Sequence, residues 1–107
     1  MKFNRAYDYT QFYQLTVTLI ARGYTVEIAN IWDGKQINVY SQSEKDDTQK
    51  VFLWDAVIHN YSYGHEDGLL EVYGTIVSEF TSDDTVCGWL TADKILSKCP
   101  PLDSSLF

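Results

Sequence analysis

An alternating segment from Tyr24 to Tyr40, interrupted once by Asp33-Gly34, constrains the fold more than any other feature of the sequence. Apolar and polar residues alternate on both sides of the interruption, as they do in strands that bury one face. Asp-Gly between two such runs is typical of a two-residue hairpin turn, because both central residues need positive φ. The sequence therefore predicts a β-hairpin over residues 24–40.

The turn also fixes which residues of the hairpin lie opposite one another. With the Asp-Gly pair at its centre, the predicted pairs are Trp32 with Lys35, Asn30 with Ile37, and Ile28 with Val39. Side chains of a strand alternate between the two faces of its sheet. The predicted core-facing residues are Val26, Ile28, Ile37 and Val39, whereas Glu27, Asn38 and Tyr40 point the other way.

Helical patterns stand at both ends of the chain. Four apolar residues recur at i, i+3, i+7 and i+8, which places them on one helix face: Phe12, Leu15, Leu19 and Ile20. Asp8 or Thr10 can cap this helix, and Gly23 can end it. A second helix is expected over Ala92–Cys99, with Thr91 as its cap and with Ile95, Leu96 and Cys99 facing inward.

Two further apolar runs, Leu69–Val77 and Val86–Leu90, are predicted to be strands, the first with Leu70, Val72 and Ile76 on its core side. Helices at both ends with strands between them indicate an α+β fold with an antiparallel sheet built on the 24–40 hairpin. One domain should span residues 1–107, with 101–107 as a loose tail.

The segment Val51–Tyr63 admits two interpretations. Its apolar residues fall at helical spacing, which favours a helix: Val51, Trp54, Val57, Ile58 and Tyr61. In the alternative, residues 51–54 form a strand and a short helix starts at Asp55. The preceding stretch, Ser41–Lys50, has no apolar residue and is expected to be a loop.

Charge is distributed unevenly along the chain. The formal net charge is -7, and residues 51–93 contain eight acids but neither Lys nor Arg. Nucleic acids and anionic membranes are bound through Lys and Arg, so neither is expected as a direct partner. A one-sign surface attracts a complementary one, and this segment therefore favours a basic protein partner. The alternative is that the acids only keep the protein in solution.

No apolar run approaches the roughly 18 residues that span a bilayer. The first residues, Met1 to Arg5, also lack the apolar stretch of a secretory signal. A cytoplasmic location is therefore expected. Cys87 and Cys99 are too few and too far apart for a disulfide framework or a zinc ribbon, and reduced thiols are expected.

The sequence contains few residues in patterns typical of a metal site or a catalytic site. His59 and His65 are the only histidines, and their spacing is no established metal-ligand pattern. On a helix, Asp55 and His59 would be i, i+4 neighbours that form a local hydrogen bond. A His65–Glu66 acid–base pair is conceivable, but no nucleophile, oxyanion hole or phosphate loop accompanies it. Neither metal nor cofactor is expected, and an enzyme is disfavoured.

The residues most suggestive of binding lie at the end of the ambiguous segment Val51–Tyr63 and directly after it. Tyrosines beside acids are typical of protein interfaces, and here they border the polar loop Ser62–Gly68. The candidate partner-binding residues are Tyr61, Tyr63, His65, Glu66 and Asp67. Packing of the two tyrosines over the rim of a small core is the structural alternative.

Three short stretches, Trp54–His59, Ser62–Gly74 and Val86–Ala92, resemble small proteins of unassigned function from phages and integrative elements of Gram-positive bacteria. The resemblance covers about a third of the chain and brings no catalytic residues. It implies an accessory protein of a mobile element.

These observations together predict a small acidic protein-binding module that acts stoichiometrically on a basic host or defence protein. An immunity or antitoxin-type inhibitor of a basic toxin is the first alternative. A small-molecule-binding protein or enzyme that uses the His59/His65 region is the second. A homodimer, formed through an exposed sheet edge, stays open.

Overall fold

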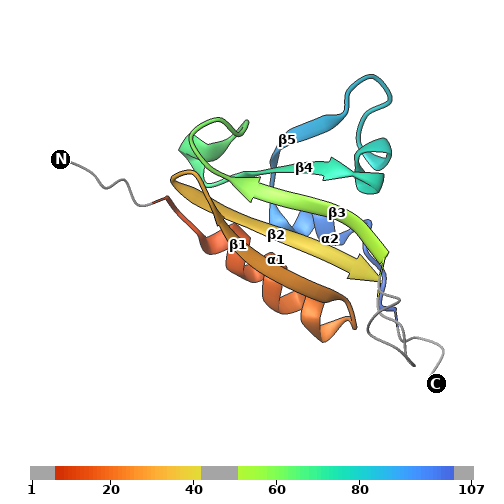
Figure 1. The fold of residues 1–107 in the computed structure, drawn as a ribbon. Coiled ribbons are helices and arrows are strands. Elements are labelled where there is room, and N and C mark those ends of the chain that lie inside the picture. The colour runs from red at the N-terminus through yellow and green to blue at the C-terminus, as the bar shows by residue number, and fades with distance from the viewer. Residues whose placement is uncertain (1–6, 42–50, 103–107) are drawn as a thin grey trace.

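Five antiparallel strands form one sheet in the order β1-β2-β3-β4-β5, and two helices cover one of its faces (Figure 1). The computed structural model describes residues 7–41 and 51–102. The elements are α1 (Thr10–Ala21), β1 (Thr25–Ile31), β2 (Gly34–Ser41), β3 (Val51–Ile58), the 3-10 turn η2 (His65–Asp67), β4 (Leu70–Gly74), the 3-10 turn η3 (Thr75–Glu79), β5 (Val86–Leu90) and α2 (Ala92–Leu96). The predicted α+β fold is confirmed.

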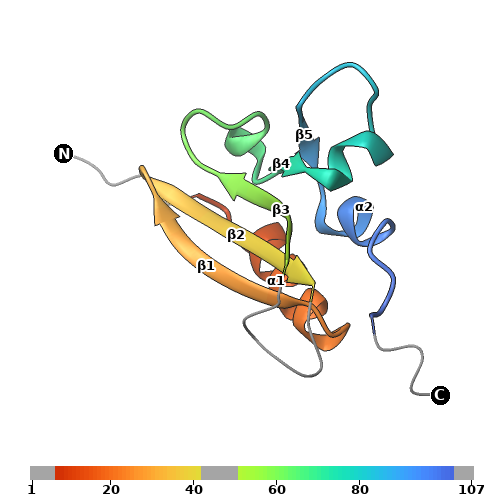
Figure 2. The same ribbon diagram turned by 45° about the vertical axis from the view of Figure 1, so that its right-hand side comes forward.

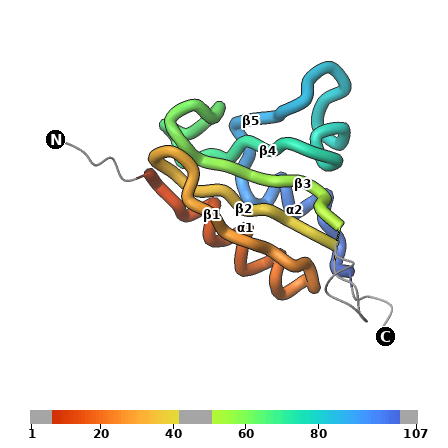
Figure 3. Tube along the Cα trace, viewed as in Figure 1, coloured from red at the N-terminus to blue at the C-terminus, as the bar shows by residue number. Residues whose placement is uncertain are grey.

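The chain passes from each strand to its neighbour without a crossover, as Figure 3 traces. The core lies between the sheet and the helices, seen from the side in Figure 2. Its fully enclosed side chains come from both layers: Phe12, Leu15 and Leu19 from α1, Ile37, Val39, Ala56, Ile58, Leu70 and Val72 from the strands, and Ala92 and Ile95 from α2. Among the described residues, no helix is long and apolar enough to cross a membrane.

The first helix follows the predicted pattern except at one position. Phe12, Leu15 and Leu19 are buried, but Ile20 is 56% exposed, and Thr16 takes its place in the core. The buried Thr16 hydroxyl donates to the carbonyl of Phe12, so its burial leaves no polar group unpaired. The helix ends at Gly23 (φ +96°) in a Schellman motif, in which the Gly23 and Tyr24 N–H groups donate to helix carbonyls.

The predicted hairpin is present, but its turn lies one residue earlier than expected. Ile31 pairs with Gly34 and Asn30 with Lys35, so Trp32 and Asp33 are the turn residues. Gly34 belongs to β2, where a Cβ atom would lie 1.8 Å from the carbonyl oxygen of Ile58. The glycine therefore allows β2 and β3 to approach each other and does not supply positive φ to the turn.

This shift changes which residues lie opposite one another, because Ile28 now pairs with Ile37 and Val26 with Val39. Each strand still presents the predicted residues to the helix side, since the register moves by two positions. Ile28 is nevertheless 48% exposed, because β1 is an edge strand with no neighbour on its outer side.

The helix favoured for Val51–Tyr63 is wrong. Residues 51–58 form β3, paired on both sides with β2 and β4. The strand alternative is right for residues 51–54, but no short helix starts at Asp55. A central strand that is apolar on both faces can show the same apolar spacing as a helix face. Pairing with β2 and β4 on both sides makes this segment a strand.

Two elements are shorter than expected. The strand predicted over Leu69–Val77 ends at Gly74 (φ +118°), and η3 then brings Ile76 into the core. Helix α2 ends at Leu96 rather than Cys99, although the Thr91 side chain caps it as predicted and Cys99 is buried. The expected loop at 42–50 and the tail beyond Leu102 lie outside the described residues.

Candidate functional site

The connection between β3 and β4, residues 59–69, is held in one conformation by its own hydrogen bonds. Ser62 is buried, and its hydroxyl accepts from the N–H of His59 (3.0 Å) and donates to the carbonyl of the same residue (2.9 Å). The N–H of Tyr61 donates to Nδ1 of His59 at 3.0 Å. The side chains of Tyr61 and Tyr63 are therefore presented by a fixed turn.

The same connection packs against β5. The N–H of Trp89 donates to the carbonyl of Tyr63 at 3.1 Å. Gly88 makes this approach possible, because a Cβ there would lie 2.3 Å from the Cβ of Tyr63. Asp33 ties the connection to the β1–β2 turn, since its carboxylate accepts from the N–H of Asn60 (3.0 Å) and from the hydroxyl of Tyr7. Three separate segments of the chain thus meet at this end of the sheet.

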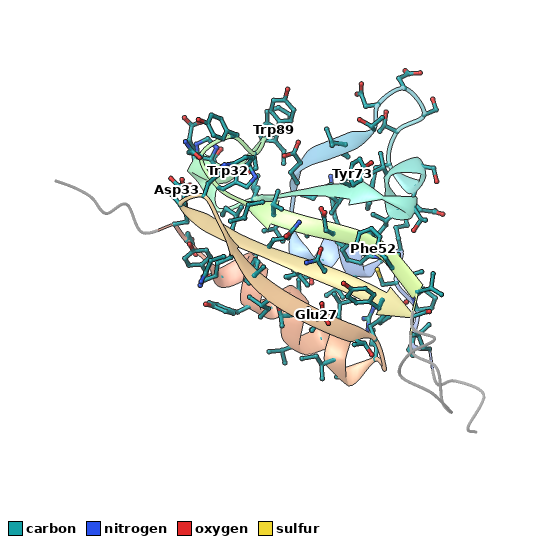
Figure 4. The ribbon with its side chains drawn as sticks, in the orientation of Figure 1. Glu27, Trp32, Asp33, Phe52, Tyr73 and Trp89 are labelled. Atoms are coloured by element: carbon teal, nitrogen blue, oxygen red, sulfur yellow. The ribbon has the colours of Figure 1, made fainter. Side chains whose placement is uncertain are left out.

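Two pairs of aromatic rings lie where these three segments meet. Trp32 packs edge-on against Tyr61, with ring centroids 5.1 Å apart, and against His59 at 4.6 Å. Tyr63 stacks on Trp89 at 5.0 Å with the ring planes 16° apart. We call Trp32, Tyr61, Tyr63 and Trp89 the aromatic rim; their side chains are 52–69% exposed. Figure 4 shows Trp32 and Trp89 at the same end of the sheet.

Both tryptophans of the rim have a left-handed backbone, with φ of +51° at Trp32 and +55° at Trp89. Among the described residues other than glycine, only these two have positive φ. The conformation costs a side chain about 1–2 kcal/mol, and bulky residues adopt it rarely. Such strain concentrates at functional sites. The coincidence of strain, exposure and ring pairing marks the rim as a candidate site.

The predicted binding residues all lie at this end of the molecule, in three different environments. Tyr61 and Tyr63 belong to the rim, while Glu66 and Asp67 are exposed in η2. His65 is half-buried: its ring lies edge-on to Tyr7 (5.9 Å), and its Nδ1 is 2.7 Å from the carbonyl oxygen of Ser62. The five residues therefore share one region, although the two tyrosines contact different tryptophans.

Sequence reasoning missed Trp32 and Trp89 as site residues. Trp32 was expected to lie in the strand beside the Asp-Gly turn, where its exposure would have no special meaning. The available signal was a large apolar residue immediately before a turn, since turns are normally polar. Trp89 follows Gly88 on an edge strand, and only the folded chain brings it onto Tyr63.

The sheet face opposite the helices continues from the rim and is open. Its side chains alternate with the core residues along the strands and include Glu27, Gln36, Asn38, Phe52, Asp55, Glu71 and Tyr73. Figure 4 shows Glu27, Phe52 and Tyr73 along this face. The Lys and Arg residues that the structure describes all lie elsewhere, on α2 or just after it, at the end of α1, or on the helix side of β2. The open face is therefore acidic in its described part.

Two carboxylates of the open face are partly buried. Burial raises the pKa of Asp55, and a hydrogen bond from Nε2 of Gln36 (3.1 Å) opposes the rise. Burial also raises the pKa of Glu71, against a hydrogen bond from the backbone of Tyr63, and the nearby charge of Asp55 adds to the rise. A cation placed over this face would stabilise the ionised form of both carboxyl groups.

Asp55 gives the protein a measurable pH dependence. A carboxyl whose pKa is raised by folding binds its proton more tightly in the folded state, so its ionisation lowers the free energy of unfolding as pH rises from about 4 through the raised value. We expect Asp55→Asn to raise the melting temperature at about pH 7 and to leave it unchanged at about pH 3. The control variant Asp84→Asn, at an exposed loop position, should leave the melting temperature unchanged at both pH values. A lower melting temperature of Asp55→Asn at neutral pH would contradict this account.

Both histidine rings make hydrogen bonds within the β3–β4 connection. His59 is buried, burial lowers its pKa, and its Nδ1 is occupied by the N–H of Tyr61. The described residues contain no cluster of three or more His, Cys, Asp or Glu that could hold a metal ion. Grooves of about 590 and 490 Å³ flank Gly88 and Trp89, and no histidine lines either.

Both cysteines are free thiols, as expected. Burial raises the pKa of Cys99 to about 11, so that thiol is unreactive at neutral pH.

Comparison with protein-family models, with curated proteins and with solved structures finds no match to this chain.

Proposed function

We propose that this chain is a small acidic protein-binding module, encoded by a mobile genetic element, that acts by stoichiometric contact with a basic host or defence protein. The observation that carries the proposal is the aromatic rim beside an open sheet face on which the described charges are all negative. The module acts in the cytoplasm, and neither nucleic acid nor membrane is its direct partner.

The two parts of the surface have different tasks. Exposed Trp and Tyr side chains supply most of the binding energy in many interfaces, because they bury a large area at little entropic cost. Acidic groups around them attract a basic surface and orient it during the encounter. Trp32 and Trp89 thus join Tyr61 and Tyr63 as anchors, while Glu66 and Asp67 pair with Lys or Arg of the partner and His65 supports their turn.

An immunity or antitoxin-type inhibitor is a special case of the same module. The rim favours it in one respect: before any partner arrives, hydrogen bonds hold the backbone that carries Tyr61, and packing holds the rings. A surface preorganised in this way loses little entropy on binding and suits a tight inhibitor. A gene for one cognate basic toxin next to the gene for this chain would distinguish this case.

A pull-down from nuclease-treated lysate of the bacterial host tests the proposal. The tagged chain is washed at about 0.1 M and at about 0.5 M salt, and the retained proteins are identified by mass spectrometry. We expect one basic protein to be retained at the lower salt and depleted at the higher, because the screening length falls from about 10 Å to below 5 Å. The chain with Glu66→Lys and Asp67→Lys should retain less of it. Retention that ignores both salt and charge reversal would contradict the proposal.

A further inference from the structure

The helix α1 carries a second apolar stripe that the core does not use. Tyr13, Val17 and Ile20 lie at i, i+4 and i+7, on one flank of the helix, and are 47–65% exposed. The twelve residues of α1 include no charged side chain. A surface helix normally presents polar and charged residues to water, so an uncharged helix with an exposed apolar flank indicates a covered face.

The stripe faces the outer edge of the sheet. The opposite flank of α1 contacts the other helix, because Nε2 of Gln14 donates to Asp93 and Oε1 of Gln11 accepts from the N–H of Ala92. The flank with Tyr13, Val17 and Ile20 is therefore turned away from α2. Figure 1 shows α1 running beside the edge strand β1, and Ile28 of β1 is also half-exposed on the helix side.

The two edge strands of the sheet differ in how they resist pairing. Strand β5 has five residues, its pairing with β4 is irregular between Leu70 and Val72, and Trp89 distorts its backbone. Strand β1 has seven residues in unbroken register with β2 and contains neither Pro nor Lys. Irregularity, shortness, charged side chains and Pro are the features that keep edge strands from joining another sheet. Of these, strand β1 has only one charged side chain, that of Glu27.

We propose that a second copy of this chain pairs with it through β1, antiparallel and around a two-fold axis, so that the two sheets join and the two α1 stripes pack beside each other. Full pairing of the seven-residue strand places Ile28 opposite Ile28 of the other copy. Glu27 then lies opposite Ala29, and the two Glu27 carboxylates are not directly opposed. An isologous contact of this kind closes on itself and forms a dimer.

Charge selects a second copy over a basic partner at this face. The only charged side chain of β1 and α1 together is Glu27, so a basic surface would find little to pair with there. Two copies can bring an uncharged face together despite the net charge of -7 on each. The inference does not depend on the proposed function, because the aromatic rim and the open face stay exposed in the dimer.

The size of the face sets the expected strength of the dimer. Strand β1 is about 24 Å long and α1 about 18 Å, so the edge and the stripe together offer on the order of 400 Å² per copy. The pair would bury about 800 Å², below the roughly 1,200 Å² of stable interfaces. The dimer should therefore dissociate on dilution.

Sedimentation velocity of the full chain tests the dimer. Between about 10 and 500 μM, the sedimentation coefficient should rise from monomer to dimer, and about 0.5 M salt should favour the dimer because it screens the repulsion between like charges. This salt response is opposite to that of a basic partner, so the two proposals fail separately. Val17→Lys with Ile28→Lys should raise the dissociation constant at least about 10-fold. Val51→Lys, an equally exposed apolar residue outside the face, should not. A wild-type chain that stays monomeric at about 500 μM overturns the proposal.

A cysteine cross-link tests the register without depending on the lysine variants. In a Cys87→Ser background, Ile28→Cys should form a disulfide-linked dimer with diamide as the oxidant, because directly opposed Cα atoms lie about 4.5–5.5 Å apart. Asn30→Cys should not, because the two copies of residue 30 would be about 14 Å apart along the strands. Equal cross-linking at both positions, or none at residue 28, overturns the pairing through β1.

Discussion

Gly34→Ala is expected to destabilise this protein more than a change of one methyl group normally does. The added Cβ would lie 1.8 Å from the carbonyl oxygen of Ile58 and 2.9 Å from the Cα of His59, both in the backbone. Neither atom can move without parting β2 from β3 at the end of the sheet next to the aromatic rim. We expect a loss of at least about 3 kcal/mol in the free energy of unfolding. That loss lowers the melting temperature by about 12 °C or more for a domain of this size.

A comparison of substitutions separates this steric role from a role in the turn. If Gly34 served the turn by positive φ, Asn would be tolerated there, because Asn adopts that conformation more readily than other side chains. Close approach of the strands predicts that Gly34→Asn is at least as damaging as Gly34→Ala. Gly23→Ala is the control, since its φ of +96° gives an expected cost of about 1–2 kcal/mol. A Gly34→Ala protein that melts within a few degrees of wild type would contradict the steric explanation.

Replacing both rim tryptophans by glycine is expected to abolish partner binding while the fold survives. Each substitution removes ring contacts worth about 0.5–1.5 kcal/mol and relieves about 1–2 kcal/mol of left-handed strain. The two effects oppose each other, so the melting temperature should change little. Loss of two central aromatic anchors should weaken binding of the basic protein retained in the pull-down about 100-fold or more, measured by titration calorimetry.

Alanine at the same positions provides the matched comparison. Trp32→Ala and Trp89→Ala lose the same ring contacts but keep the strain, so each should melt below its glycine counterpart. Tyr13→Ala removes an exposed aromatic side chain of α1 that is not part of the rim and should leave partner binding unchanged. Glycine variants that bind normally would show that the rim is not the contact surface. Alanine variants as stable as the glycine variants would show that the tryptophan backbones are not strained.

Local sequence patterns were sufficient for much of the fold. The alternation around Asp33-Gly34 identified the hairpin, the apolar spacing of Phe12, Leu15 and Leu19 identified α1, and Thr91 marked the start of α2. These signals reside in residues that are close in sequence, and their physical causes, side-chain periodicity and capping, act locally.

The errors came from contacts between distant residues. The spacing of Trp54, Val57 and Ile58 fits a helix until β2 and β4 pair with that segment on both sides. The hairpin turn was misplaced because the role of Gly34 is set by Ile58, which lies 24 positions away. Composition could locate the acids of residues 51–93, but their partial burial on an open sheet face depends on strand pairing.

The candidate site likewise contains residues that local sequence signals could identify and residues that only contacts between distant segments bring in. Tyr61, Tyr63, Glu66 and Asp67 were recognisable because exposed tyrosines near acids have a chemical meaning that a short segment shows by itself. Trp32 and Trp89 became site residues only through folding, which places the β1–β2 turn and β5 on either side of one connection. The sequence by itself determined the class of most elements, though not that of residues 51–58, together with the buried helix face and the acidic charge of the chain, because periodicity and composition are local properties. The tertiary structure alone decided the register, the strained tryptophans and the unprotected β1 edge, because each depends on which backbone lies beside which.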